Sequence, residues 1–128
     1  MRIRSLLVVL VLSLVSALPL FAQLPASTQA EVGQYLRTNY TKREVMIPVR
    51  DGVKLFTVIY EPKDKSQKYP VLLNRTPYTV GPYGPDSFKN TVGPNYLFAR
   101  EGYIFAYQDV RGRWRSEGVW EDVRPDIA

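Results

Sequence analysis

The sequence predicts an α/β fold in which an antiparallel hairpin leads into the parallel strands of a mixed sheet. Asp51-Gly52 stands between two extended segments, and this dipeptide is a strong indication of a hairpin turn. Two short apolar runs, residues 69–74 and 103–107, bracket a helical segment at residues 95–100. That order is typical of a βαβ crossover between parallel strands. A hairpin joined to such a unit gives a mixed sheet.

The first half of the chain predicts a helix and the hairpin. Residues 31–37 carry apolar side chains at i, i+3 and i+4, the spacing of one helix face. A first strand is expected over residues 43–48. The return strand is expected over residues 53–60, where β-branched and aromatic residues favour extended structure. We interpret Asp51-Gly52 as the turn between them and not as a ligand site.

The second half predicts the βαβ unit. Residues 69–74 are interpreted as a buried strand, because an apolar run is bounded by polar residues. Residues 79–94 are rich in Gly and Pro, and a loop of this length in a compact domain is usually functional. The helix at 95–100 should end at Glu101-Gly102. Residues 103–107 predict a second buried strand.

The N-terminus predicts a secretory signal peptide over residues 1–22. A short basic segment with Arg2 and Arg4 precedes an apolar stretch at residues 5–21, and Ala22-Gln23 offers a cleavage point. An uncleaved membrane anchor is the alternative. Export without cysteine is typical of a bacterial periplasmic or secreted protein. Residues 23–42 are then expected to form a linker and a short helix.

Composition excludes several kinds of site within this chain. The 128 residues contain no His and no Cys. A Ser-His-Asp triad, a Cys-His dyad, an imidazole or thiolate metal site and a disulfide therefore cannot be built from them. None of the serines lies in a G-x-S-x-G elbow; they occupy positions 5, 13, 16, 27, 66, 87 and 116. We expect no cofactor and no metal.

The charge of the chain argues against nucleic acid as a partner. The net charge of +5 falls to +3 once the two arginines of the leader are removed, which is too modest for such binding. Three arginines share one turn: Arg111, Arg113 and Arg115. They predict either an anion-binding patch or internal ion pairs, and we favour the pairs. The candidate partners within the turn are Asp109, Glu117 and Glu121.

Four short motifs occur in a fixed order along the chain. They read IPVRDGVKL at 47–55, PVLLNRTPY at 70–78, FAREGY at 98–103, and QDVRG with SEG at 108–118. Together they resemble the N-terminal portion of the α/β-hydrolase family that includes cocaine esterase, α-amino-acid ester hydrolase, glutaryl acylase and X-Pro dipeptidyl-peptidases. The resemblance implies that residues 43–128 are the N-terminal portion of a catalytic domain, an incomplete hydrolase sheet.

The resemblance also implies an activity. Members of this family are serine hydrolases that cleave esters, amides or X-Pro peptides through an acyl-enzyme. Their nucleophile, Asp and His follow downstream of the turn near residue 118, so the chain is expected to end before the nucleophile elbow and to be inactive alone. The substrate would be a small ester, amide or short peptide. No membrane partner is expected after signal cleavage, and a homo-oligomer of the complete protein stays open.

Tyr78 is the catalytic candidate. In the family, the Tyr of the R-x-P-Y motif donates its hydroxyl to the oxyanion hole, and this sequence reads Arg75-Thr76-Pro77-Tyr78. A tyrosine hydroxyl is a neutral donor at pH 7, and the preceding proline restricts the approach of the chain. The competing interpretation is a tyrosine that only packs at the end of a strand.

Asp109, Arg111 and Glu117 are interpreted as structural residues. Asp109 stands at the end of a strand, where α/β sites gather, but the arginines nearby favour an ion-paired, turn-fixing residue. Arg111 and Glu117 are interpreted in the same way. Tyr83 and Phe88 either line a substrate pocket or fold the long loop back on itself. The rival to the hydrolase hypothesis is a small secreted binding module for anionic cell-wall or other polymers, which would use the basic turn.

Overall fold

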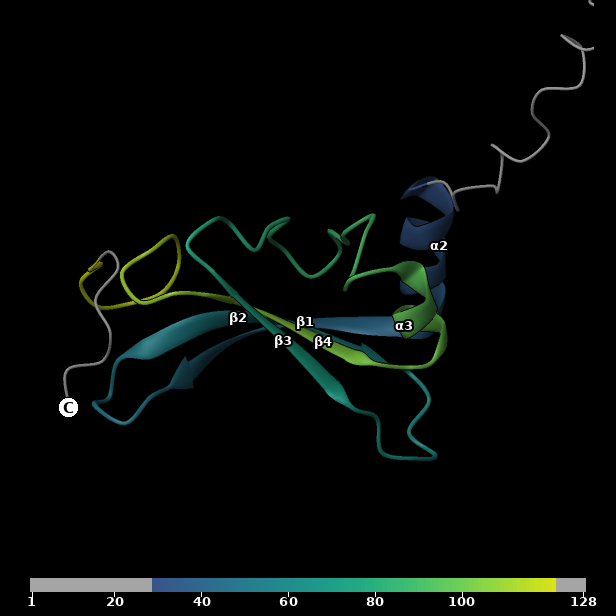
Figure 1. The fold of residues 1–128 in the computed structure, drawn as a ribbon, viewed down its shortest axis with the longest axis horizontal. Helices are drawn as coiled ribbons and strands as arrows, with labels where there is room; N and C mark the ends of the chain where they lie inside the picture. The colour runs from purple at the N-terminus through teal and green to yellow at the C-terminus, as the bar shows by residue number, and fades with distance from the viewer. Residues whose placement is uncertain (1–28, 122–128) are drawn as a thin grey trace, which may run out of the picture.

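The structure, a computed structural model, describes residues 29–121. The predicted signal peptide at residues 1–22 lies outside these described residues. No helix within residues 29–121 is long and apolar enough to cross a membrane. The elements in chain order are α2 (Gln29–Asn39), β1 (Tyr40–Pro48), β2 (Lys54–Pro62), β3 (Val71–Thr76), α3 (Tyr96–Arg100) and β4 (Ile104–Asp109) (Figure 1).

The strands form one mixed sheet in the order β1-β2-β4-β3. β1 pairs with β2 and β2 pairs with β4 in antiparallel fashion, whereas β3 and β4 are parallel. The predicted hairpin and the predicted βαβ crossover are both confirmed. The last strand of the described region lies between two earlier ones, so the sheet is not assembled in sequence order.

The hairpin closes at the predicted dipeptide. The N–H of Gly52 donates to the carbonyl of Val49 at 2.9 Å, and the N–H of Val49 donates to the carbonyl of Val53 at 2.8 Å. Gly52 has a φ of 85°, which glycine adopts without a steric penalty. β1 begins at Tyr40, three residues before the predicted start at residue 43. Its first residues alternate buried and exposed, which is the period of a strand.

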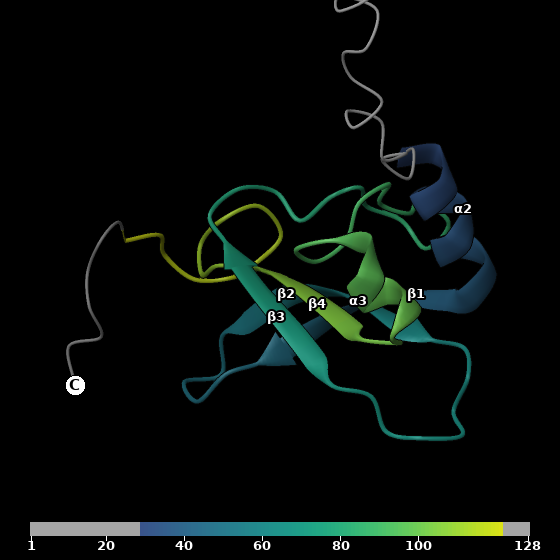
Figure 2. The same ribbon diagram turned by 45° about the vertical axis from the view of Figure 1, so that its right-hand side comes forward.

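The helices and the long loop after β3 lie on the same side of the sheet (Figures 1 and 2). The ring of Tyr35 in α2 meets that of Tyr96 in α3 edge-on, with centroids 5.2 Å apart. The hydroxyl of Tyr40 donates to the carbonyl of Ala99 at 2.8 Å. The buried core on this side consists of Val32, Leu36, Tyr40, Phe56, Val58, Tyr60, Val80, Val92, Ala99 and Phe105.

β3 corrects the prediction of a buried strand at residues 69–74. It occupies an edge of the described sheet, and Val71 and Leu73 are 59% and 55% exposed. Leu72 points to the other face and packs against the core. The prediction was wrong because an apolar strand is buried only where both faces are covered, and the helices of residues 29–121 cover one face.

The helix in the crossover from β3 to β4 begins and ends close to where the sequence predicts. The side chain of Asn95 caps α3 by accepting the N–H of Leu97 at 2.9 Å. After the helix, Gly102 adopts a φ of 81°, as expected for a helix-ending glycine. β4 then enters the sheet with Phe105, Ala106, Gln108 and Asp109 buried. The predicted helix and the predicted buried strand are confirmed.

Candidate functional site

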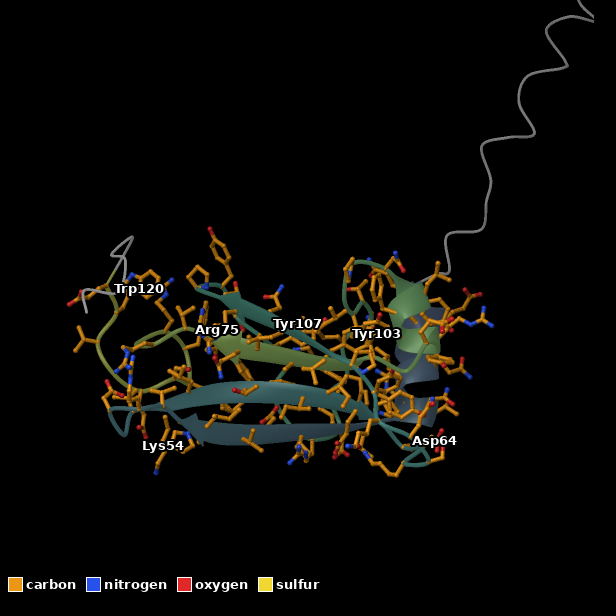
Figure 3. All side chains as sticks on the ribbon, turned by 60° about the horizontal axis from the view of Figure 1, so that its bottom comes forward. Lys54, Asp64, Arg75, Tyr103, Tyr107 and Trp120 are labelled. Carbon is orange, nitrogen blue, oxygen red and sulfur yellow. The ribbon has the colours of Figure 1, made fainter. Side chains whose placement is uncertain are left out.

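The candidate site lies where β3 and β4 end. Thr76 pairs with Asp109 in the parallel register, so the two strands finish at the same edge of the sheet. The loops at residues 77–95 and 110–118 both leave from this edge. In α/β sheets, ligands bind at the carboxyl ends of the parallel strands. In Figure 3, Trp120 and Lys54 are labelled at this end.

Tyr78 has a fixed backbone and a free side chain. Its N–H donates to Thr76 Oγ1 at 3.0 Å. The carbonyl of the preceding residue, Pro77, accepts from Trp114 Nε1 at 3.0 Å and from Arg113 Nε at 3.2 Å. The Tyr78 side chain is nevertheless 76% exposed. The structure therefore does not bury this tyrosine against the end of the strand.

The side chain of Asp109 accepts hydrogen bonds from the backbone of the two loops around it. Its side chain is buried, and its two carboxylate oxygens accept the N–H groups of Val80 at 3.3 Å and Arg115 at 3.4 Å. Its own carbonyl accepts the hydroxyl of Ser116 at 2.7 Å. Burial raises the pKa of the Asp109 carboxyl, although the N–H donors of Arg115 and Val80 oppose this. Asp109 thus joins the two loops of the edge, which fits a turn-fixing role.

Two of the three arginines of the turn form ion pairs with the hairpin. Arg111 Nη1 lies 2.8 Å from Asp51 Oδ2, and Arg115 Nη1 lies 3.5 Å from Glu44 Oε2. The hydrogen bond from Arg111 is the main cause that lowers the pKa of Asp51. Asp109 forms no direct ion pair within residues 29–121: its oxygens accept backbone N–H groups, and while burial raises its pKa, the Tyr83 hydroxyl and the charge of Arg115 also act to lower it.

Glu117 joins the same turn to the start of β2. Its Oε2 accepts the N–H of Lys54 at 2.9 Å, and its own N–H donates to the Lys54 carbonyl at 2.9 Å. Ser116 Oγ accepts the N–H of Phe56 at 2.8 Å. Through these contacts the turn pairs with the first residues of β2, which lie before the part of β2 that pairs with β4. Glu117 therefore fixes the turn as expected, but through the backbone of Lys54 and not through an ion pair among the described residues.

The basic turn is not a free cationic patch. Arg111 and Arg115 have acidic partners. The guanidinium of Arg113 donates to Pro77 and lies 5.2 Å from the ring centroid of Trp120. An anionic polymer would compete with these partners for the guanidinium groups. This arrangement does not favour the binding-module hypothesis.

A buried lysine that sequence reasoning missed holds the long loop. Lys42 Nζ donates to the carbonyls of Pro82 at 2.6 Å, Gly84 at 2.7 Å and Ser87 at 2.7 Å, and it lies 3.1 Å from Glu44 Oε1. Its side chain is 0% exposed. The strand alternation that buries Tyr40 places Lys42 on the same face, and this was the available indication in the sequence.

The aromatic residues of the loop pack onto the sheet. Tyr83 meets Phe56 edge-on with centroids 5.6 Å apart, and Phe88 meets Tyr60 at the same separation. The guanidinium carbon of Arg115 lies 4.3 Å from the Tyr83 ring centroid. Of the two interpretations left open for Tyr83 and Phe88, the structure supports folding the loop back over the core.

The mixed sheet and the βαβ crossover place the protein in the α/β class, with the candidate site at the carboxyl ends of its parallel strands. The chain has the N-terminal part of an α/β-hydrolase fold. More specifically, it belongs to the family described as X-Pro dipeptidyl-peptidase (S15 family), which matches residues 51–128.

Individual relatives agree with this assignment. Cocaine esterase from Rhodococcus sp. is 43% identical over 79 residues, which cover 58% of this chain and 12% of that protein. The structure of an α-amino acid ester hydrolase matches with a TM-score of 0.54 and 42% identity over 68% of this chain and 15% of its own. An aminopeptidase from a Thaumarchaeota archaeon matches with a TM-score of 0.51 and 38% identity over 65% and 14%. The chain thus spans a small part of the length of these relatives.

Proposed function

We propose that the complete protein containing this chain is a serine hydrolase that cleaves esters or amides through an acyl-enzyme. The matched relatives are named as an esterase, an ester hydrolase and an aminopeptidase. All three names describe attack on an acyl carbon bonded to oxygen or nitrogen. We propose α-amino-acid esters, related amides and X-Pro peptides as the substrate class. The nucleophile and its base would come from segments other than residues 1–128, which lack histidine.

The observation that carries the proposal is that Tyr78 combines a hydrogen-bonded backbone with an exposed side chain. Its backbone N–H and the carbonyl before it are both hydrogen-bonded, while the side chain is 76% exposed at the carboxyl edge of the parallel strands. Within residues 29–121 no segment covers Tyr78, so its hydroxyl is open to a ligand or to another segment of the complete protein. A fixed backbone with an accessible hydroxyl is the arrangement that an oxyanion-hole donor requires.

The proposed chemistry follows from the charge that develops during acyl transfer. Attack on the carbonyl carbon places a negative charge on the substrate oxygen. The Tyr78 hydroxyl would donate to this oxygen, together with a second donor elsewhere in the complete protein. Because the donor is already oriented, little reorganisation accompanies the reaction. One such donor stabilises the transition state by about 3 kcal/mol, which corresponds to roughly a hundredfold in kcat.

The test is Tyr78→Phe in the complete protein, assayed with a p-nitrophenyl ester of an α-amino acid. We expect kcat to fall about a hundredfold and KM to change little, because the hydroxyl acts in the transition state. Tyr69→Phe is the matched control. Tyr69 also has a hydroxyl contact, 2.6 Å from Asp64 Oδ2, but precedes β3 and lies away from the carboxyl edge. A wild-type kcat in Tyr78→Phe would contradict the proposed role.

A further inference from the structure

We propose that Trp114 and Arg113 are positioning residues for Tyr78, an inference that rests on the proposed function. Both side chains come from the turn after β4 and reach across to the loop after β3. Their N–H groups converge on one atom, the carbonyl oxygen of Pro77, at 3.0 Å and 3.2 Å. That carbonyl belongs to the peptide bond that leads directly into Tyr78.

Two donors on one carbonyl determine the plane of this peptide group. The peptide unit is planar, and the opposite side of the same unit is also bound, through the Tyr78 N–H to Thr76 Oγ1 at 3.0 Å. Two residues further on, the N–H of Val80 donates to the buried Asp109 at 3.3 Å. The backbone is thus held before and after Tyr78. The remaining freedom of the tyrosine hydroxyl lies mainly in its own side-chain torsions.

The backbone of Trp114 indicates that its position is enforced. It has a φ of 51°, in the left-handed region that a bulky residue rarely adopts. Burial of the indole does not explain this conformation, because the side chain is 59% exposed. With this conformation the Ser116 N–H closes a turn onto the Arg113 carbonyl at 2.9 Å, and the indole N–H reaches the carbonyl of Pro77 at 3.0 Å. Strained residues that persist in this way concentrate at functional sites.

Backbone hydrogen bonds and close packing within the turn fix the positions from which the Arg113 and Trp114 side chains project. The N–H of Arg113 donates to the Val110 carbonyl at 3.1 Å, and the N–H of Ser116 donates to the Arg113 carbonyl at 2.9 Å. Gly112, with a φ of 68°, donates to the carbonyl of Glu117 at 2.9 Å. A Cβ at Gly112 would collide with the backbone of Val119 and Trp120. The indole and the guanidinium therefore project from a closely packed turn.

The test compares two variants in two backgrounds of the complete protein. Trp114→Phe removes the indole N–H and keeps a ring, while Arg113→Met removes every N–H donor of the side chain and keeps an unbranched stem. In the wild-type background, we expect each variant to lower kcat about tenfold with KM within about twofold, because misplacing a transition-state donor costs catalysis more than binding. In the Tyr78→Phe background, we expect neither variant to lower kcat further.

The double-mutant comparison separates positioning from general stability. Equal losses of kcat in both backgrounds would show that the turn acts independently of the Tyr78 hydroxyl and would overturn the inference, as would wild-type kcat in both single variants. Thermal melting of every variant identifies loss of folded protein, and kcat is calculated per folded molecule. A wild-type kcat in Tyr78→Phe alone would instead contradict the proposed function, so the two failures are distinguishable.

Discussion

Lys42→Met measures how strongly one buried ammonium group holds the loop that follows Tyr78. The Lys42 side chain is 0% exposed and donates to three carbonyls of the loop. Methionine has a similar length and fills most of the same space but donates no hydrogen bond. The substitution would leave those carbonyls without the ammonium donor and would remove one of the partners of the Glu44 carboxylate. It therefore removes an interaction and leaves the packing largely intact.

The free-energy cost of Lys42→Met depends on the burial of the lost ammonium group and on the partners that Glu44 retains. Removing one partner of a buried charged group costs about 3–5 kcal/mol. Glu44 keeps other partners, because its Oε1 accepts the N–H of Gly84 at 2.6 Å and its Oε2 lies 3.5 Å from Arg115. We therefore expect the lower end, about 3 kcal/mol for opening of the loop. This corresponds to roughly a hundredfold change in the opening equilibrium.

Hydrogen–deuterium exchange of peptides that cover residues 82–90 measures this equilibrium. The relevant amides include those of Gly84, Ser87 and Lys89, which donate to Glu44, to Gly84 and to Tyr60. Their protection should fall about a hundredfold in Lys42→Met. Exchange reports local opening, so the measurement does not depend on reversible unfolding of a large protein.

Lys63→Met is the matched control. Lys63 Nζ also donates to backbone carbonyls, those of Arg37 at 2.9 Å and Thr38 at 2.8 Å, but it is exposed. Exposed charge contacts contribute about 0–1 kcal/mol, so protection near the end of α2 should fall less than about fivefold. If Lys42→Met affected its loop no more than Lys63→Met affects its helix end, the reasoning from burial would be refuted.

Two further predictions concern pH and backbone conformation. Burial raises the pKa of Tyr60 to about 12, so its contribution to stability is complete below about pH 10 and is lost as the pH rises toward 12. Tyr60→Phe loses the acceptor for the Lys89 N–H and should be less stable than wild type at pH 8. Urea titrations should show this difference in unfolding free energy narrowing above pH 10. A difference that stays constant with pH would contradict the prediction. Gly112→Ala should lower Tm far more than Gly52→Ala, since both glycines have positive φ but only the first has backbone atoms where the Cβ would lie; equal shifts in Tm would count against the clash.

The sequence predicted those parts of the fold that depend on neighbouring residues. The turn at Asp51-Gly52 and the stop at Gly102 just after α3 follow from local backbone preferences, and both occur where expected. The burial of β3 could not be predicted in this way. Whether Val71 and Leu73 are covered depends on what packs against the second face of the sheet, and an apolar run does not contain that information.

The candidate site was predicted in part, and Tyr78 was proposed from a motif. The residues around it depend on contacts between segments far apart in the chain, such as Arg115 with Glu44 and Trp114 with Pro77. Sequence reasoning expected the arginines to find acidic partners inside their own turn. The sheet order instead brings the hairpin beside that turn, and this proximity is a property of the topology that local patterns do not encode.

The strand order also has a consequence for the time course of folding. β4 is made after β3, yet it lies between β2 and β3. While the chain emerges from a ribosome, β2 and β3 are present before their common neighbour exists, and only the short segment at residues 63–70 separates them. Direct pairing of β2 with β3 closes a small loop and costs little entropy. Such a premature pair must open again before β4 can enter. Where the pair does not form, the β2 edge that β4 will occupy stays unpaired throughout synthesis of residues 77–103.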